Sequence, residues 1–214
     1  MKKYFVFMLI TTMLLTSGIV YSHELDSRLV GKVIVLDAGH GGKDKGTSVG
    51  NVYESDINLS IVLKLKNALN KQGVDVILTR DGDYDLSGPN VSRRKKSDFD
   101  NRIKLINNSG ADLYLSIHMN YLVDSRYYGA QVFYTKNNEI LAKELQESMI
   151  NNLGSPLKEK KLSNSIYMYK QLSIPGVLIE CGFLSNDNER KMLVTDKYQE
   201  KIVDAIVEGL LKYF

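Results

Sequence analysis

The sequence of 214 residues is short of several residue types from which common sites are built. It has a single cysteine, Cys181, which excludes an intrachain disulfide and any zinc site built from cysteines. Only three histidines are present, so a metal site would have to combine histidine with carboxylates. Prolines number only three and charged residues 25%, a composition that argues against a disordered chain.

The charge balance also excludes one class of partner. Lysine and arginine exceed aspartate and glutamate by only three, and the basic residues form no long block, so we expect no nucleic-acid partner. Hydrophobic residues make up 43% of the chain, enough to fill one core. The length leaves no room for two ordinary domains and a linker, so we expect one domain.

The N-terminal segment has the pattern of an export signal. Lys2 and Lys3 precede an uncharged apolar stretch over residues 4–20, and a polar run begins at Ser22. We predict a signal peptide or membrane anchor over residues 1–22, and His23 beside it without a role. The protein would then act outside the cytoplasmic membrane, either secreted or held in the cell envelope, with the membrane as a partner if the segment stays uncleaved.

Apolar runs alternate with amphipathic stretches along the rest of the chain, which predicts parallel βαβ units. We expect a single three-layer α/β domain over residues 30–214, with a mostly parallel twisted sheet and helices on both faces. The expected strands are residues 32–37, 74–79, 112–117, 130–135, 166–169 and 177–181. The expected helices begin at Ser55 or Asp56, span residues 97–109 and 138–152, and begin again near Asp196.

Chemically active residues follow the predicted strands, where ligands of such sheets bind. His40 and His118 each lie at the end of an apolar run, Glu54 stands at the entrance of a helix, and Glu180 closes a later strand. A catalytic zinc ion takes three protein ligands and keeps one position open. We predict zinc on His40, Glu54 and His118, with Glu180 as the catalytic carboxylate that takes a proton from a zinc-bound water.

Each of these residues alone also has a purely structural interpretation. A histidine at a strand end often only forms hydrogen bonds, and Glu54 could merely favour the start of a helix. Cys181 invites comparison with a nucleophile, but alternation along a strand turns it away from Glu180 and into the core. The glycine-rich loop over residues 39–46 lacks the spacing of a nucleotide-binding motif.

Several segments together resemble the zinc-dependent N-acetylmuramoyl-L-alanine amidases of bacterial cell walls, the amidase 3 family. The matching pieces are residues 33–46 (VIVLDAGHGGKDKG), Glu54, residues 79–83 (TRDGD), Arg102, residues 111–120 (ADLYLSIHMN) and residues 174–189 (IPGVLIECGFLSNDNE). The resemblance implies zinc on His40, Glu54 and His118 and Glu180 as the catalytic carboxylate. It also implies peptidoglycan as the substrate, cleaved between muramic acid and L-alanine of the stem peptide.

One segment is similar to the germination-specific members that act on spore cortex, where the reaction prepares muramic-δ-lactam. This segment covers residues 92–102 (SRRKKSDFDNR) and lies in a long predicted loop over residues 81–97. We expect the loop to form a lip over the substrate groove that includes Arg93 and Arg94. The resemblance suggests the forespore intermembrane space as a location.

Two other functions remain open from the residues alone. A zinc-dependent peptidase acting on free peptides would use the same chemistry, with Asp37 or Asp44 as extra ligands if two metals were bound, although Asp37 better suits a supporting role. A non-catalytic wall-binding module would not need Glu180. The family often carries wall-binding repeats and this sequence has none, so we expect an activating or targeting protein partner; the substrate-binding residues stay unassigned.

Overall fold

The computed structural model describes residues 27–135, 138–161 and 166–214. The predicted export segment over residues 1–22 and His23 lie outside the described residues. The central sheet has the strand order β4-β1-β5-β8-β6-β7. These strands are β1 (Val33–Ala38), β4 (Asp75–Leu78), β5 (Leu113–Asn120), β6 (Gln131–Tyr134), β7 (Lys160–Lys161) and β8 (Gly176–Phe183). Neighbouring strands are parallel except β6 and β8, which confirms the mostly parallel sheet.

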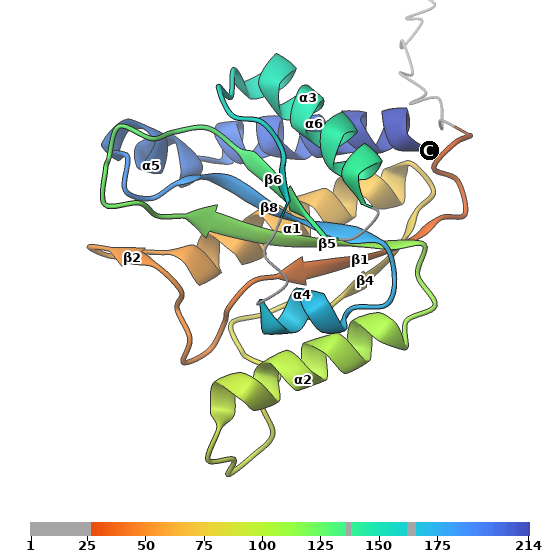
Figure 1. Ribbon diagram of the computed structural model, residues 1–214, viewed down its shortest axis with the longest axis vertical. Helices are drawn as coiled ribbons and strands as arrows, with labels where there is room; N and C mark the ends of the chain where they lie inside the picture. Colours follow the sequence, from red (N-terminus) through yellow and green to blue (C-terminus); the bar gives the residue numbers. More distant parts are fainter. Residues whose placement is uncertain (1–26, 136–137, 162–165) are drawn as a thin grey trace, which may run out of the picture.

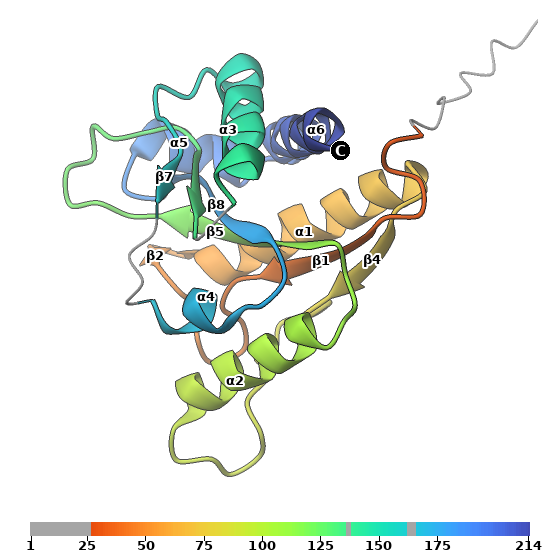
Figure 2. The same cartoon turned by 45° about the vertical axis from the view of Figure 1, so that its right-hand side comes forward.

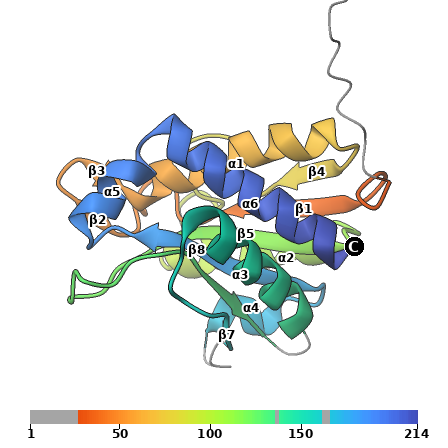
Figure 3. The ribbon, with the colours of Figure 1, turned by 90° about the horizontal axis from the view of Figure 1, so that it is seen from above.

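Helices cover both faces of the sheet (Figures 1 and 2). One face carries α1 (Glu54–Lys71), α3 (Glu139–Leu153) and α6 (Asp196–Tyr213), onto which Figure 3 looks. The other face carries α2 (Arg94–Asn107) and α4 (Tyr167–Gln171). A short helix, α5 (Asp187–Leu193), and a hairpin of β2 (Ser48–Val49) and β3 (Val52–Tyr53) complete the described elements. The predicted three-layer α/β domain is therefore confirmed.

Alternation along β5 divides the core between the two layers. Leu113, Leu115 and Ile117 are buried with α1 and its neighbours, whereas Tyr114 belongs to a smaller cluster with α2 and α4. Cys181 is fully buried in the first cluster. This position confirms that Cys181 faces away from the side of the sheet that Tyr114 occupies.

Three of the predicted local details are wrong. The segment expected to be a strand over residues 166–169 is helix α4, because Met168, Tyr169 and Leu172 are buried at helical rather than alternating spacing. Helix α2 already begins at Arg94, which shortens the predicted loop. Helix α1 begins at Glu54 after an N-cap at Tyr53, so neither Ser55 nor Asp56 caps it.

Different segments of the chain lie at the two ends of the parallel strands. The C-terminal residue Phe214 lies beside the start of β1, with the Lys32 ammonium 4.5 Å from the centre of its ring. Arg28 donates a hydrogen bond to the carbonyl of Leu211 on the same side. The loops that follow the carboxyl ends of β1 and β5 lie at the opposite end of these strands, one strand length away. In the described part of the chain, no helix is both long and apolar enough to cross a membrane.

Candidate metal centre

His40 lies in the glycine-rich loop that leaves the carboxyl end of β1. Its φ angle of 60° is in the left-handed region, which few residues other than glycine adopt. The Arg102 side chain of α2 holds this backbone, because its Nη2 donates to the His40 carbonyl at 2.6 Å. The Nδ1 atom of His40 lies 3.2 Å from Asp44 Oδ2, which leaves Nε2 to point towards Glu54. The loop therefore presents one ring nitrogen of His40 to the site.

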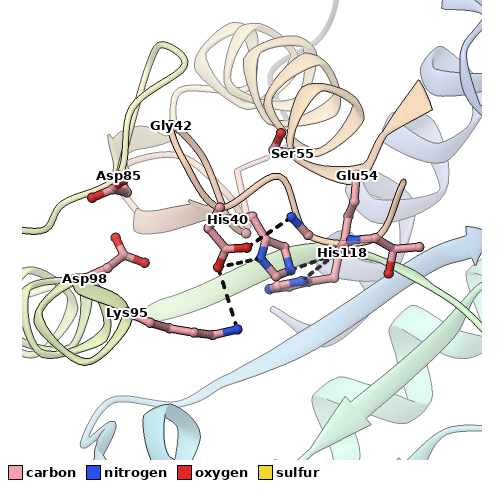
Figure 4. Close-up of polar contacts among 12 residues, drawn as sticks. His40, Gly42, Glu54, Ser55, Asp85, Lys95, Asp98 and His118 are labelled. Carbon is pink, nitrogen blue, oxygen red and sulfur yellow. Dashed lines mark hydrogen bonds and ion pairs between the residues drawn. The ribbon is translucent and has the colours of Figure 1, made fainter. Parts of the chain in front are cut away.

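Glu54 is the first residue of α1, one position further into the helix than predicted, and its carboxylate lies between the two histidines (Figure 4). Its Oε1 is 3.2 Å from His40 Nε2 and 2.9 Å from His118 Nδ1, and it accepts a hydrogen bond from the Met119 amide. Oε2 accepts from the Thr47 amide. Burial acts to raise the pKa of Glu54, but the hydrogen bonds and charge of the histidines outweigh it and hold the pKa well below its usual range.

His118 lies on β5, the strand beside β1, and completes the group. One ring nitrogen of each histidine and a carboxylate oxygen of Glu54 all lie within 4.8 Å of one another. The nitrogens nearest to Glu54 Oε1 are Nδ1 of His118 and Nε2 of His40. Burial acts to lower the pKa of His40, but the hydrogen bonds and negative charge of Glu54 and Asp44 outweigh it and raise the pKa. The structure thus brings together all three predicted ligands, in a field that attracts a cation.

Glu180 lies on β8 directly beside His118 of β5. Its Oε2 atom is buried, and among the described residues it has no hydrogen-bond partner. Burial raises the pKa of Glu180 to about 7; the charge of Glu54 adds to this effect, and those of His118 and His40 oppose it. A carboxylate with a raised pKa and a free oxygen beside a metal-ligand set is suited to exchange protons with a bound reactant.

The two aspartates considered as ligands of a second metal have other partners. Asp44 contacts His40, and the Lys95 ammonium approaches the same oxygen to 3.7 Å (Figure 4 shows Lys95). Asp37 is buried and accepts hydrogen bonds from Arg102, Thr79 and Ser116, so its oxygens already have partners within the protein. Within the described residues, one His/Glu/His group is the only candidate set, so the site does not favour a two-metal peptidase.

Sequence reasoning missed one wall of the site. A cavity of about 180 Å³ separates the ligands from an apolar wall that α2 and α4 contribute. This wall consists of Phe99, Ile166, Tyr167 and Met168. The helical spacing of Met168, Tyr169 and Leu172 was the available signal for α4.

The loop predicted to form a lip is shorter than expected, because α2 begins at Arg94. A second cavity of about 640 Å³ lies between the glycine-rich loop and residues 83–94, and Gly42, Asp85 and Arg94 are part of its lining. Arg94 forms an ion pair with Asp85, and Arg93 is exposed. The loop therefore borders a hollow next to the candidate metal centre, while the function of its arginines stays a prediction.

A mostly parallel sheet with a His/Glu/His group and a buried carboxylate beyond the carboxyl ends of its strands is an arrangement suited to a hydrolase. The family model for N-acetylmuramoyl-L-alanine amidase matches residues 34–212. The chain therefore belongs to this family. Its activity is hydrolysis of the amide bond between N-acetylmuramic acid and L-alanine in cell-wall peptidoglycan.

Individual relatives agree with this assignment. The germination-specific N-acetylmuramoyl-L-alanine amidase of Bacillus subtilis (strain 168) is 42% identical over 192 residues, which cover 87% of this chain and 81% of the relative. The CwlD amidase of Clostridioides difficile, solved in complex with the GerS lipoprotein, is 43% identical with a TM-score of 0.81. That match covers 85% of this chain and 98% of the solved one. An N-acetylmuramoyl-L-alanine amidase of Clostridium difficile 630 is 32% identical with a TM-score of 0.75, covering 85% and 96% of the two chains.

Proposed function

We propose that the chain is a zinc-dependent amidase that binds one zinc ion through His40, Glu54 and His118. The observation that carries this proposal is the convergence of these three donors beside Glu180 Oε2, which has no hydrogen-bond partner in the described part of the chain. Two histidines and one carboxylate with an open position fit a catalytic zinc ion, and hydrogen bonds from the Met119 and Thr47 amides hold Glu54 in place. Because the three donor atoms already lie within 4.8 Å of one another, zinc could bind without a rearrangement of the fold.

The reaction follows from the positions of the side chains. Bound zinc would lower the pKa of water and stabilise the negative charge that develops on the amide oxygen. Glu180 takes a proton from the attacking water and then donates it to the nitrogen of L-alanine as the amide bond breaks. The apolar wall of α2 and α4 keeps bulk water from this face of the reactants.

Replacing Glu180 tests this assignment. We expect Glu180→Gln to lower the rate of peptidoglycan hydrolysis by about 100- to 10,000-fold, the usual contribution of a general base. Zinc content, measured by elemental analysis, should stay at one ion per chain, whereas His118→Ala should lose the ion. The exposed Glu147→Gln is the matched control and should keep its activity. Full hydrolysis by Glu180→Gln would refute the role of this carboxylate.

We propose spore cortex as the substrate within peptidoglycan. The support is the 42% identity to the germination-specific amidase and the related segment over residues 92–102. Digestion of purified vegetative and cortex peptidoglycan, with identification of the new amino ends, tests the proposal. Faster release of peptides with N-terminal L-alanine from cortex is the expected result, and a preference for vegetative wall would contradict it.

We further propose that a protein partner activates or targets the enzyme outside the cytoplasmic membrane. The relative solved with a lipoprotein supports a partner, and the cell-wall substrate supports an extracytoplasmic location. Residues 1–22 would provide export as a signal peptide or membrane anchor. The zinc content and activity of the purified chain, with and without a cell-envelope extract, test for the partner. Full zinc occupancy and activity of the chain alone would contradict the need for one.

A further inference from the structure

Tyr169 of α4 contacts His118 at the ring nitrogen that Glu54 does not contact. Its hydroxyl lies 3.5 Å from His118 Nε2 and 3.1 Å from Ser116 Oγ. Ser116 in turn donates to Asp37 at 2.6 Å. We propose that Asp37, Ser116 and Tyr169 form a hydrogen-bond relay that holds His118 with its Nε2 protonated and its Nδ1 free for a metal ion. This inference rests on the proposed zinc site.

The directions of the hydrogen bonds follow from a count of donors. Asp37 is ionised, because Arg102 forms an ion pair with it in a fully buried position, so it only accepts. The single hydroxyl proton of Ser116 is used in the bond to Asp37. Tyr169 must therefore donate its own proton to Ser116, since the serine oxygen has only acceptor capacity left. The relay is polarised in one direction, from Tyr169 towards Asp37.

The same count fixes the role of Tyr169 towards the histidine. With its proton used on Ser116, the Tyr169 oxygen can only accept, so it favours the tautomer of His118 that carries the proton on Nε2. That tautomer leaves the lone pair on Nδ1, which faces the proposed ligand Glu54 at 2.9 Å from Oε1. Without a metal, Glu54 competes by accepting a proton from Nδ1. A cation at Nδ1 removes this competition and makes the Nε2 proton a stronger donor to Tyr169.

The far end of the relay is rigid. Besides Ser116, Asp37 accepts hydrogen bonds from Arg102 Nη1 at 2.6 Å and Thr79 Oγ1 at 2.8 Å. Tyr169 is itself buried in the cluster between the sheet and α2 and α4. A partner behind each metal-binding histidine fixes the orientation of its ring and strengthens metal binding. Tyr169 is therefore a positioning residue for His118.

The zinc affinity of a Tyr169→Phe protein tests the relay directly. The dissociation constant for zinc is measured by competition with a chromophoric chelator in the purified full chain, with no substrate present. We expect zinc binding to weaken about tenfold, the lower end of the effect of losing such a partner. Tyr114→Phe is the matched control, because it removes a hydroxyl from the same buried cluster and should keep the wild-type affinity. Excess zinc should restore hydrolysis by Tyr169→Phe with an unchanged KM.

The outcomes separate this inference from the proposed function. His118→Ala should abolish zinc binding, and retention of zinc by that variant would refute the metal centre itself. Wild-type zinc affinity in Tyr169→Phe, with binding lost in His118→Ala, would overturn only the relay. Far-UV circular dichroism of the metal-free proteins verifies folding. If Tyr169→Phe does not fold, Ser116→Ala decides the question, because it breaks the same relay and should also weaken zinc binding, whereas unchanged affinity would overturn the proposal.

Discussion

The closeness of the ligand side chains depends on glycines at two points of the loop after β1. A Cβ atom on Gly39 would lie 2.2 Å from the His118 ring. A Cβ atom on Gly46 would lie 2.6 Å from Glu54 Oε2 and 2.7 Å from the His40 ring. Any larger residue at these positions must displace a ligand. These glycines therefore belong to the metal centre although they offer no ligand atom.

We expect Gly46→Ala to reduce the free energy of zinc binding by more than it reduces the free energy of unfolding. Gly50 provides the control, since it has a similar φ angle of 59° and nothing lies within 4 Å of its added Cβ. Both substitutions carry a backbone penalty of about 1 kcal/mol, because alanine rarely adopts positive φ. Only Gly46→Ala should raise the zinc dissociation constant in a chelator competition assay. Equal zinc affinities in the two variants would contradict this explanation.

Cys181 is predicted to be inert in the folded protein. Burial raises the pKa of its thiol, so little of the reactive thiolate is present at neutral pH, and its side chain packs in the core. We expect a thiol reagent to label Cys181 only after denaturant unfolds the chain, and activity to survive treatment of the folded enzyme. Rapid labelling with loss of activity would instead indicate an accessible thiol near the site.

At the residue scale, sequence reasoning located the residues of the candidate metal centre but not what lies behind them. His40, His118 and Glu180 could be found because they follow apolar runs, and the carboxyl ends of such strands converge. The contact from Tyr169 to His118 depends on how a short helix packs against the sheet. No pattern in residues 166–172 gives that packing angle, so this partner could be seen only in three dimensions.

At the scale of elements, Arg102 joins α2 to the end of β1. Its guanidinium contacts Asp37 and Asp98 and the carbonyls of Ala38 and His40. We expect Arg102→Met to lower the free energy of unfolding by about 3–5 kcal/mol, because it leaves buried carboxylates without their partner. Urea unfolding measures the change. The exposed ion pair of Arg126 is the control, and Arg126→Met should cost less than about 1 kcal/mol.

The same ion pair predicts how stability depends on pH. Burial acts to raise the pKa of Asp37, but Arg102 and the hydrogen bonds from Ser116 and Thr79 outweigh it and hold the pKa below 3.8. The unfolded chain therefore takes up this proton at a higher pH than the folded protein does. We expect the contribution of Asp37 to be complete above about pH 5 and to be lost as the pH falls below about 4. The free energy of unfolding is measured by urea at a series of pH values. Asp37→Asn should make it fall less steeply below about pH 5. The same steepness in the variant and the wild type would contradict this role of Asp37.

Long elements were predictable and short ones were not. Helices α1, α3 and α6 and the buried strands contain enough residues to show a hydrophobic period. Helix α4 has five residues, so the spacing of its buried residues is a weak signal, and the hairpin strands β2 and β3 have only two residues each. The elements that sequence reasoning missed are thus the ones that tertiary contacts specify.

At the scale of the whole molecule, the fold positions the residues of the candidate metal centre. Backbone amides hold Glu54, and neighbouring parallel strands hold His118 and Glu180 in register. We expect a chelator to abolish activity while the far-UV circular dichroism spectrum stays unchanged. Added zinc should raise the melting temperature, because a ligand at one hundred times its dissociation constant stabilises the folded state by about 2.7 kcal/mol. Loss of secondary structure on chelation would show that the fold depends on the metal.

The position of the C-terminus at the amino end of β1 has a practical use. Phe214 lies beside the start of β1. The proposed catalytic groups lie beyond the carboxyl end of β1, at the opposite end of the strand. A linker attached after Phe214 would therefore fix the protein to a bead with the proposed active site turned outwards. Insoluble wall fragments, which cannot diffuse into a matrix, would contact that site directly. The orientation of the sheet thus makes the C-terminus the point from which to display this enzyme on a solid support.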